Sequence, residues 1–401
     1  MLSVGAKYAG VSRPPGYPLW TLYSWLFATL LPFSNMAWRV AVGSAVAAAL
    51  ACGIVALIVS YAGQRLFKDM QVFARFGSSE RNLLRGVCGY AAGLILGFSG
   101  VVWDTAVVAD VWSLSLLLFA GIVCMLVRWM FEPHRRKFLL AGFLLLGLLL
   151  TNSQQLVVVV PGLICFLMMV DRKLGRDAAF FVLPLMTVAT AANQFGIWIS
   201  FPRMLNYPLL AAFVITLAAG VLLAVKTRRV GTEWKFVLPC GLCLILGLSL
   251  YLYVPIASMT VPPANWGYPR TVEGFFNVIG VGQYERVQPT SDLNQFLSQM
   301  WLYVRVAGNE MGWPYLIVSL LPFCLLFRMS PTGRRCLSGL LVVWCSVAPL
   351  LLWELNPPPE RQALELIRRY FAASYVLIAV SFGFGLLWLG AKMTEPANTS
   401  A

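Results

Sequence analysis

Residues 40–63 read VAVGSAVAAALACGIVALIVSYAG, a run without a single charged side chain. A helix over this run is about 36 Å long at 1.5 Å per residue, which exceeds the ~30 Å hydrocarbon core of a bilayer. Backbone groups inside lipid must be paired within the segment itself, and a helix does this. The run therefore predicts a transmembrane helix.

The same apolar character extends along the whole chain. Of the 401 residues 59% are hydrophobic and 11% are charged, and the mean hydropathy is +0.77. One water-soluble core cannot enclose so much apolar surface, so the composition indicates an integral membrane protein. The short alternating segments typical of a β-barrel do not occur in the sequence.

Ten further apolar stretches complete an all-α polytopic prediction of about eleven transmembrane helices. The predicted spans are 40–63, 86–103, 107–129, 138–152, 155–170, 178–199, 208–226, 236–256, 313–328, 336–353 and 371–391. We divide the chain into 1–39 (remainder of a first outer loop with an interfacial helix), 40–256 (helices 1–8), 257–312 (a long outer loop with an amphipathic helix), 313–391 (helices 9–11) and 392–401 (a cytoplasmic tail).

Two segments outside the spans carry apolar residues at helical spacing. One begins at PLWTLYSWLF, after the proline turn RPPGYPLW at 13–20, and the other is DLNQFLSQMWLYVRV within 257–312. Both patterns predict helices that lie on the outer membrane surface.

Basic residues are distributed unequally between the two sets of loops. The set that includes Arg65, Arg135 and Arg172 carries twenty of the 30 Lys and Arg residues. The positive-inside rule places this set in the cytoplasm. The net charge of +14 mostly reflects this bias. Because the charges are spread over short loops, the bilayer is an expected partner and nucleic acid is not.

Cysteine and histidine residues do not form a recognisable metal or disulfide pattern. The nine cysteines fall in or at the edge of apolar spans, including Cys240 and Cys243, whose CxxC spacing lies inside a span. The single histidine, His134, lies in the predicted cytoplasmic cluster EPHRRK. We predict no metal site and identify no cofactor, and a divalent metal requirement stays open.

Two carboxylates stand where the surroundings are apolar. The stretch FSGVVWDTAVVADVWSLSLL (98–117) places Asp104 in a predicted turn and Asp110 about one turn into the next helix. A carboxylate at membrane depth costs ~2.5–3.5 kcal/mol or more unless it is paired or hydrated, so both residues are candidate catalytic groups. Helix capping is the alternative for Asp104.

Polar side chains near the predicted outer face are candidate binding residues. Asn152 and Gln154 interrupt the apolar run LLLTNSQQLVVV, either as a surface reversal or as contacts for a sugar or phosphate. In SMTVPPANWGYPRTVEGFF, the prolines fix a shaped loop that presents Asn265 and Trp266, which suit a sugar, and Arg270, which suits a phosphate.

Further arginines flank the last predicted spans. Arg305 follows the predicted amphipathic helix, and Arg368 and Arg369 stand in ELIRRYFAASY at the membrane border. Arg305 and Arg369 are candidate phosphate-binding residues. Anchoring of the side chains at the interface is the alternative, most of all for Arg368.

These motifs together resemble glycosyltransferase family 117, within the GT-C superfamily. The resemblance runs in order through RPPGYPLWTLYSW, LPFSNMAWRV, W-x-x-A-V-x-A-D-V-W, YLYVPIASMTVPPANWGYPRTVEGF and RRYFAASY, from residue 12 to about 376. It implies a GT-C-like fold and an enzyme that moves a monosaccharide from a polyprenyl-phosphate donor to an acceptor protein or glycan. Eukaryotic relatives are protein O-mannosyltransferases, which favours a protein hydroxyl.

The resemblance also sets expectations for location and for individual residues. It implies a bacterial inner membrane or an endoplasmic-reticulum-type membrane, with the active face outer or luminal. Tyr17 of PPGYP joins the candidate sugar or acceptor contacts, and Asp110 matches an acidic position of the family. Ser153 stands where the family commonly has histidine, and Tyr268 stands where aspartate is common.

The family places a transmembrane helix and an acidic D-x-x-E-type motif before the PPGYP turn. This sequence begins with MLSVGAKYAG, so we expect that helix and motif to be missing from it. A transporter or flippase of lipid-linked saccharides and a non-catalytic truncated homologue are the alternatives to an enzyme. Polar residues gathered at outer helix ends favour chemistry at one face over alternating access.

Overall fold

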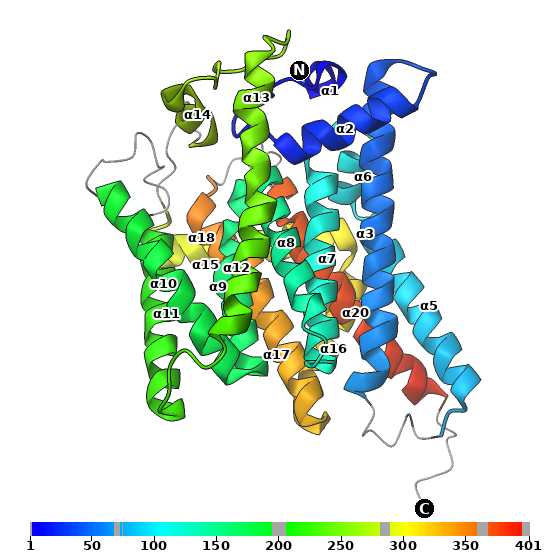
Figure 1. Ribbon diagram of the computed structural model, residues 1–401. Coiled ribbons are helices and arrows are strands. Elements are labelled where there is room, and N and C mark those ends of the chain that lie inside the picture. Colours follow the sequence, from blue (N-terminus) through cyan, green and yellow to red (C-terminus); the bar gives the residue numbers. More distant parts are fainter. Residues whose placement is uncertain are drawn as a thin grey trace, which may run out of the picture.

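The computed structural model describes residues 2–67, 73, 75–194, 206–280, 289–358 and 368–394. Within these ranges the elements are helices, and an isolated β-bridge joins Val11 to Asn265. Figure 1 shows long helices running side by side, with α1, α2 and α14 gathered at one end. We call this the α2 end. The opposite end, where α3 and α7 end and α5 begins, is called the basic end.

In chain order, the principal helices are α1 (Leu2–Tyr8), α2 (Pro18–Leu30), α3 (Met36–Leu66), α5 (Ser78–Gly97), α6 (Gly100–Ala106), α7 (Trp112–Phe131), α8 (Lys137–Asn152), α9 (Val159–Val170), α10 (Arg172–Gln194), α11 (Asn206–Thr227), α12 (Trp234–Leu248), α13 (Tyr253–Met259), α14 (Val272–Ile279), α15 (Leu293–Met311), α16 (Trp313–Cys324), α17 (Pro331–Cys345), α18 (Leu351–Leu355) and α20 (Ala372–Met393). Short helical turns, η1 (Gln154–Val158), η3 (Ser249–Leu252), η4 (Leu326–Arg328), η5 (Ser346–Leu350) and η6 (Arg368–Phe371), join or extend them.

Five helices among the described residues are long and apolar enough to cross a membrane. They are Met36–Leu66, Trp112–Phe131, Trp234–Met259, Pro331–Leu355 and Arg368–Met393. The pair α5 and α6, bent by 71° at its break, would be a sixth span, and three shorter apolar helices accompany them. The chain is a multi-pass membrane protein. Each of the eleven predicted ranges overlaps a helix, but the count of eleven stays a prediction.

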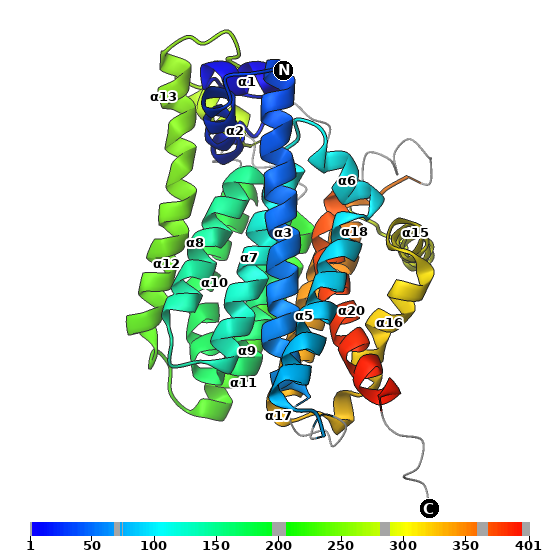
Figure 2. The same cartoon turned by 90° about the vertical axis from the view of Figure 1, so that its right-hand side faces the viewer.

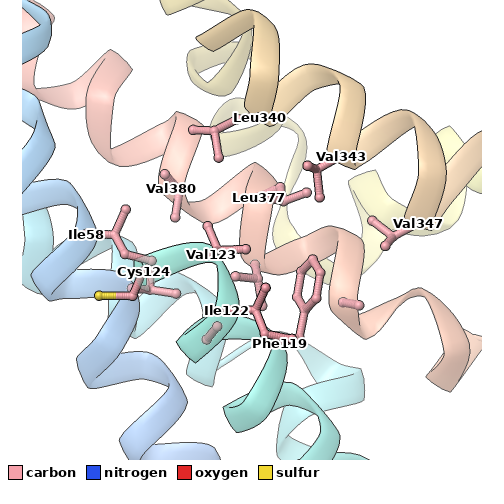
Figure 3. Packing of buried hydrophobic residues seen from close by; sticks show 14 of the residues in the cluster. Ile58, Phe119, Ile122, Val123, Cys124, Leu340, Val343, Val347, Leu377 and Val380 are labelled. Carbon is pink, nitrogen blue, oxygen red and sulfur yellow. The ribbon is translucent and has the colours of Figure 1, made fainter. Parts of the chain in front are cut away.

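The C-terminal helix Arg368–Met393 and the helix Trp112–Phe131 form the centre of the bundle. About 83% of the most apolar stretch of Arg368–Met393 is buried, and 78% of that of Trp112–Phe131, against 28% for Trp234–Met259. A helix that is apolar all round and covered on every side lies inside a bundle. Figure 3 shows this core, where side chains of α3, α7, α17 and α20 interdigitate around Phe119 and Leu377.

Helices are present at both segments predicted to lie on the membrane surface, as α2 and α15. In Figure 2 α15 is seen end-on, whereas α3 runs along the picture, so α15 crosses the direction of the long helices. Placement of α2 and α15 on the membrane surface stays a prediction.

The prediction for the segment between α5 and α7 was wrong in its boundaries. The chain breaks at Phe98 and Ser99, and α6 begins at Gly100, so Asp104 lies inside a helix and not in a turn. A non-helical link follows over 107–111, and α7 begins only at Trp112. Asp110 therefore lies in the link before the helix and not one turn into it. Tertiary hydrogen bonds, described next, hold the link in this conformation.

Candidate functional site

The link at 107–111 is anchored by three separate elements. The indole nitrogen Nε1 of Trp20, on α2, donates to the backbone carbonyl of Asp110 at 2.9 Å, and Ser44 Oγ of α3 contacts the same oxygen at 3.4 Å. Asn152, at the end of α8, donates from Nδ2 to the carbonyl of Val111 at 3.0 Å. The backbone around Asp110 is thus held from three sides before its side chain makes any contact.

The Asp110 side chain is buried and meets an arginine that is 259 positions away in sequence. Asp110 is 5% exposed. Its Oδ1 accepts a hydrogen bond from the backbone N–H of Val111 at 2.7 Å, and its Oδ2 accepts one from Nη1 of Arg369 at 2.9 Å. Burial raises the pKa of Asp110 above its usual value, and the positive charges of Arg369 and Arg13 oppose that rise. The Arg369 side chain is 42% exposed, so one side of the pair is open to solvent.

The neighbouring arginine makes a second set of ion pairs. Arg368 pairs with Asp104 of α6, and its Nη1 lies 3.1 Å from Oε1 of Glu310 on α15. The other oxygen of Glu310 accepts from the N–H of Val101 at 2.8 Å. That amide belongs to the first turn of α6, whose N–H groups have no partner within the helix and favour a negative charge.

The Glu310 carboxylate of α15 lies close to the backbone of Gly100 at the start of α6. A Cβ on Gly100 would lie 2.6 Å from Oε2 of Glu310. Without that side chain, Glu310 reaches both the helix N-terminus and Arg368. We call Asp104, Asp110, Glu310, Arg368 and Arg369 the paired-arginine site, because two consecutive arginines each hold carboxylates from other elements.

The sequence prediction brought together only part of this site. Asp104, Asp110 and Arg369 were candidates, and Asn152 was expected to contact substrate. Asn152 is fully buried, and its amide nitrogen is taken up by Val111 and by Ser115 Oγ at 2.8 Å. Its observed contacts therefore position the link.

The sequence analysis missed one charged residue of the site, Glu310, and one residue whose charge acts on it, Arg13. Glu310 reads as one polar residue of an amphipathic helix, because its partners are distant in sequence. Arg13 directly precedes the PPGYP turn, and its charge acts on Asp110 although its own side chain is exposed. An arginine beside such a rigid turn is a signal that could have identified it.

The remaining candidate residues do not contact the paired-arginine site through any described interaction. Arg305 is exposed on α15, where its guanidinium lies 5.6 Å from the centre of the Trp301 ring. Arg270 is exposed in the loop before α14. Tyr17 is 9% exposed and stands at the N-cap position of α2. Gln154 Nε2 donates to Tyr251 OH at 2.9 Å and to Ile279 O at 3.0 Å.

The loop with Asn265 and Trp266 is docked against the N-terminal segment. Val11 N donates to Ala264 O at 2.7 Å, and Trp266 N donates to Val11 O at 3.1 Å. A Cβ on Gly10 would lie 2.3 Å from the carbonyl oxygen of Ala264, so this contact requires glycine. Asn265 is half-buried and Trp266 is 36% exposed.

We also searched the described residues for a metal-binding cluster and for a cavity beside the paired-arginine site. Among the described residues, no cluster of three or more His, Cys, Asp or Glu side chains could hold a metal ion. Asp110 and Arg369 do not line any of four cavities found between described side chains, one of which lies at the basic end.

Comparison with known proteins relates the first part of the chain to a described family. Residues 3–175 match the model described as Protein O-mannosyl-transferase TMEM260 N-terminal domain. Protein O-mannosyl-transferase TMEM260 of Mus musculus is 34% identical over 161 residues, which cover 39% of this chain and 20% of the mouse protein. The chain thus spans about a fifth of the length of the curated relative it matches. No solved structure matches.

The match divides the paired-arginine site. Asp104 and Asp110 lie within the matched residues 3–175, whereas Glu310, Arg368 and Arg369 lie outside them. The matches support a relationship to the O-mannosyltransferases for the first part of the chain.

Proposed function

We propose that this chain is a membrane glycosyltransferase that moves a monosaccharide from a polyprenyl-phosphate donor to a hydroxyl group of an acceptor protein, at the outer or luminal face. One observation carries the proposal. Asp110, which lies within the stretch matched to the O-mannosyltransferase model, accepts from Arg369, whose side chain is 42% exposed. A guanidinium group that is held in place by a carboxylate and is still partly accessible to solvent suits the binding of a phosphate group carried by a lipid.

In this proposal the arginines bind the phosphate that leaves the sugar. Arg369 uses Nη1 for Asp110, which leaves other N–H groups of its planar guanidinium for phosphate oxygens. Arg13 is exposed and forms no ion pair with another described residue, and its charge already acts on Asp110. Two cations aimed at the bond that breaks would stabilise the charge that develops on the phosphate.

We assign different tasks to the two aspartates. Both oxygens of Asp110 already accept hydrogen bonds, from Val111 N–H and from Arg369, so Asp110 positions Arg369. Asp104 has a side chain that is 45% exposed, and only its Oδ2 is bound to Arg368. We therefore place Asp104 as the group that accepts the proton of the acceptor hydroxyl.

The proposed step balances without a further reactant. The acceptor oxygen bonds to the anomeric carbon as the bond between that carbon and the phosphate oxygen breaks. The hydroxyl proton passes to Asp104, and polyprenyl phosphate departs with its charge facing Arg369 and Arg13. Mannose is the sugar favoured by the name of the mouse relative.

The proposal is tested with the purified full chain in lipid nanodiscs. Polyprenyl-phosphate mannose with a radiolabelled sugar and an acceptor protein are supplied, and released polyprenyl phosphate and labelled protein are both measured. Removal of one group that stabilises a transition-state charge typically lowers kcat by 10²–10³-fold, so we expect about that loss for Arg369→Gln. Arg305→Gln is the matched control, because Arg305 is exposed on α15 against Trp301, and it should retain activity.

The assignment of Asp110 and Asp104 needs a readout besides rate. Asp104→Asn should remove from the pH profile of kcat/KM the rise that reports ionisation of the catalytic carboxyl group. Asp110→Glu should lower kcat/KM but keep the shape of the wild-type pH profile. Donor binding without any released polyprenyl phosphate from the wild-type chain would favour a non-catalytic role and refute the enzyme.

A further inference from the structure

A cavity of about 690 Å³, lined by both basic and apolar side chains, lies at the basic end of the bundle. Its walls come from α3, α5, α7 and α20, four helices that pack together through the bundle centre. The cavity residues that matter here are four arginines, Arg65, Arg81, Arg85 and Arg128, together with an apolar wall of Leu57, Phe73, Leu84 and Leu387. Basic and apolar side chains therefore line the same cavity, which is open to the outside.

Within the described part of the chain, acidic side chains pair with only one of the four arginines of this cavity. Among the described residues, Arg81, Arg85 and Arg128 form no ion pair, and residues 68–72 lie outside the described ranges. The fourth, Arg65, lies 3.7 Å from Oε1 of Glu132. Glu132 is in turn shared with an arginine outside the cavity, at 3.0 Å from its other oxygen.

Two of these arginines are held in place by uncharged groups. The Arg128 guanidinium lies 5.4 Å from the centre of the Tyr61 ring, and its Nε is buried without a hydrogen-bond partner. Arg85 donates to the side-chain oxygens of Gln64 and Asn82, and its Nε is also buried without a partner. Ring faces and amide oxygens orient a guanidinium without neutralising it.

General features of membrane proteins explain some of these arginines, but they do not explain why the four arginines line one cavity. The positive-inside rule accounts for arginines in loops, and a helix C-terminus favours a cation such as Arg65, which donates to the Tyr61 carbonyl at 3.0 Å. Arg81 is in the first turn of α5, where the helix dipole disfavours a cation. Its Nε donates to the Gly77 carbonyl at 3.4 Å, and an anion in the cavity would favour its position beside Arg85 and Arg128.

We infer that this cavity binds the headgroup of an anionic phospholipid, with the phosphate between Arg81, Arg85 and Arg128. Phosphate oxygens are the natural partners of several unpaired guanidinium groups, and the apolar wall offers a surface for the start of an acyl chain. The cavity lies about 24 Å along α7 from the link that carries Asp110, since sixteen residues separate Trp112 from Arg128. The inference does not depend on the proposed function.

Native mass spectrometry of the purified full chain in a neutral detergent tests this inference. The probes are phosphatidylglycerol, phosphatidylcholine and inorganic phosphate, titrated separately. We expect wild-type protein to retain phosphatidylglycerol at least about tenfold more tightly than phosphatidylcholine, and not to retain inorganic phosphate at comparable concentration. Equal binding of the two lipids, or phosphate bound as tightly as phosphatidylglycerol, would overturn the assignment to an anionic lipid.

Paired variants locate the binding. Each charge-assisted hydrogen bond is worth roughly a factor of ten in affinity, so Arg81→Gln with Arg128→Gln should weaken phosphatidylglycerol binding by about 100-fold. Arg334→Gln with Arg335→Gln is the matched control, because both residues are exposed on α17 and neither lines the cavity. Unchanged binding in the first pair, or equal loss in both, would refute the site. Sugar transfer plays no part in this measurement.

Discussion

Replacing Arg369 by glutamine should destabilise the protein more than replacing Asp110 by asparagine. The reason is the unequal burial of the two partners, because Asp110 is 5% exposed and the Arg369 side chain is 42% exposed. Arg369→Gln leaves a buried carboxylate without its cation, which costs about 3–5 kcal/mol in a fully buried pair. Because the Arg369 side chain is partly exposed, solvent screens this pair, and we expect Arg369→Gln to lower the free energy of unfolding by about 1–2 kcal/mol. Asp110→Asn leaves an arginine that reaches water, and should cost less than about 1 kcal/mol.

The assay is thermal unfolding of the purified chain in one detergent across a range of pH. For a chain of this size, the expected loss for Arg369→Gln corresponds to roughly 1–3 °C in Tm. The pKa of Asp110 is already raised by burial, and loss of Arg369 raises it further. A carboxyl group whose folded pKa is raised stabilises the fold while protonated, and loses that contribution as pH rises through the folded pKa. The deficit of Arg369→Gln should therefore shrink from about pH 8 toward pH 5.

The double variant, Asp110→Asn with Arg369→Gln, is the control for this prediction. If the pair is coupled, Asp110→Asn should recover part of the stability lost in Arg369→Gln, and the two effects will not add. Equal losses in the two single variants, additive losses in the double variant, or a deficit that grows as pH falls would each refute the asymmetry derived from burial.

Three further substitutions test how the site is held together. Asn152→Ala should lower stability by about 1–3 kcal/mol in thermal unfolding, since it removes two buried hydrogen bonds; an unchanged Tm would contradict this. Gly100→Ala should force Glu310 away from the start of α6 and lower kcat, and full activity would show that this contact is dispensable. Gly10→Ala should detach the loop at Ala264, which limited proteolysis would report as faster cleavage within 257–270; wild-type cleavage rates would argue against the docking.

The helices of this protein could be located from the sequence because local composition is enough to identify a long apolar run as a helix. The break between α5 and α7 could not. In the stretch 98–117, Asp104 is the residue that most resembles a turn or cap, yet the chain breaks at Ser99 and again at 107–111. The second break is held by Trp20, Ser44 and Asn152, which come from three other helices and leave no periodic signal around it.

Charged residues of the site were predictable only in part, for a related reason. Asp110 stood out because its neighbours are apolar, and Arg369 because it lies at a membrane border; the two are in contact. Glu310 was overlooked because a lone acid on an amphipathic helix is normally solvated, and only the fold places it beside Arg368 and α6. Arg305 lies over the ring of Trp301 on its own helix, and its predicted role in phosphate binding stays a prediction.

The most direct test of the central claim measures polyprenyl phosphate released from polyprenyl-phosphate mannose by the purified full chain, with an acceptor protein present, for wild type, Arg369→Gln and Arg305→Gln. The account predicts release by wild type and by Arg305→Gln, and a loss of about 10²-fold or more for Arg369→Gln. Wild-type release that persists undiminished in Arg369→Gln, or the absence of release from wild type, would contradict it.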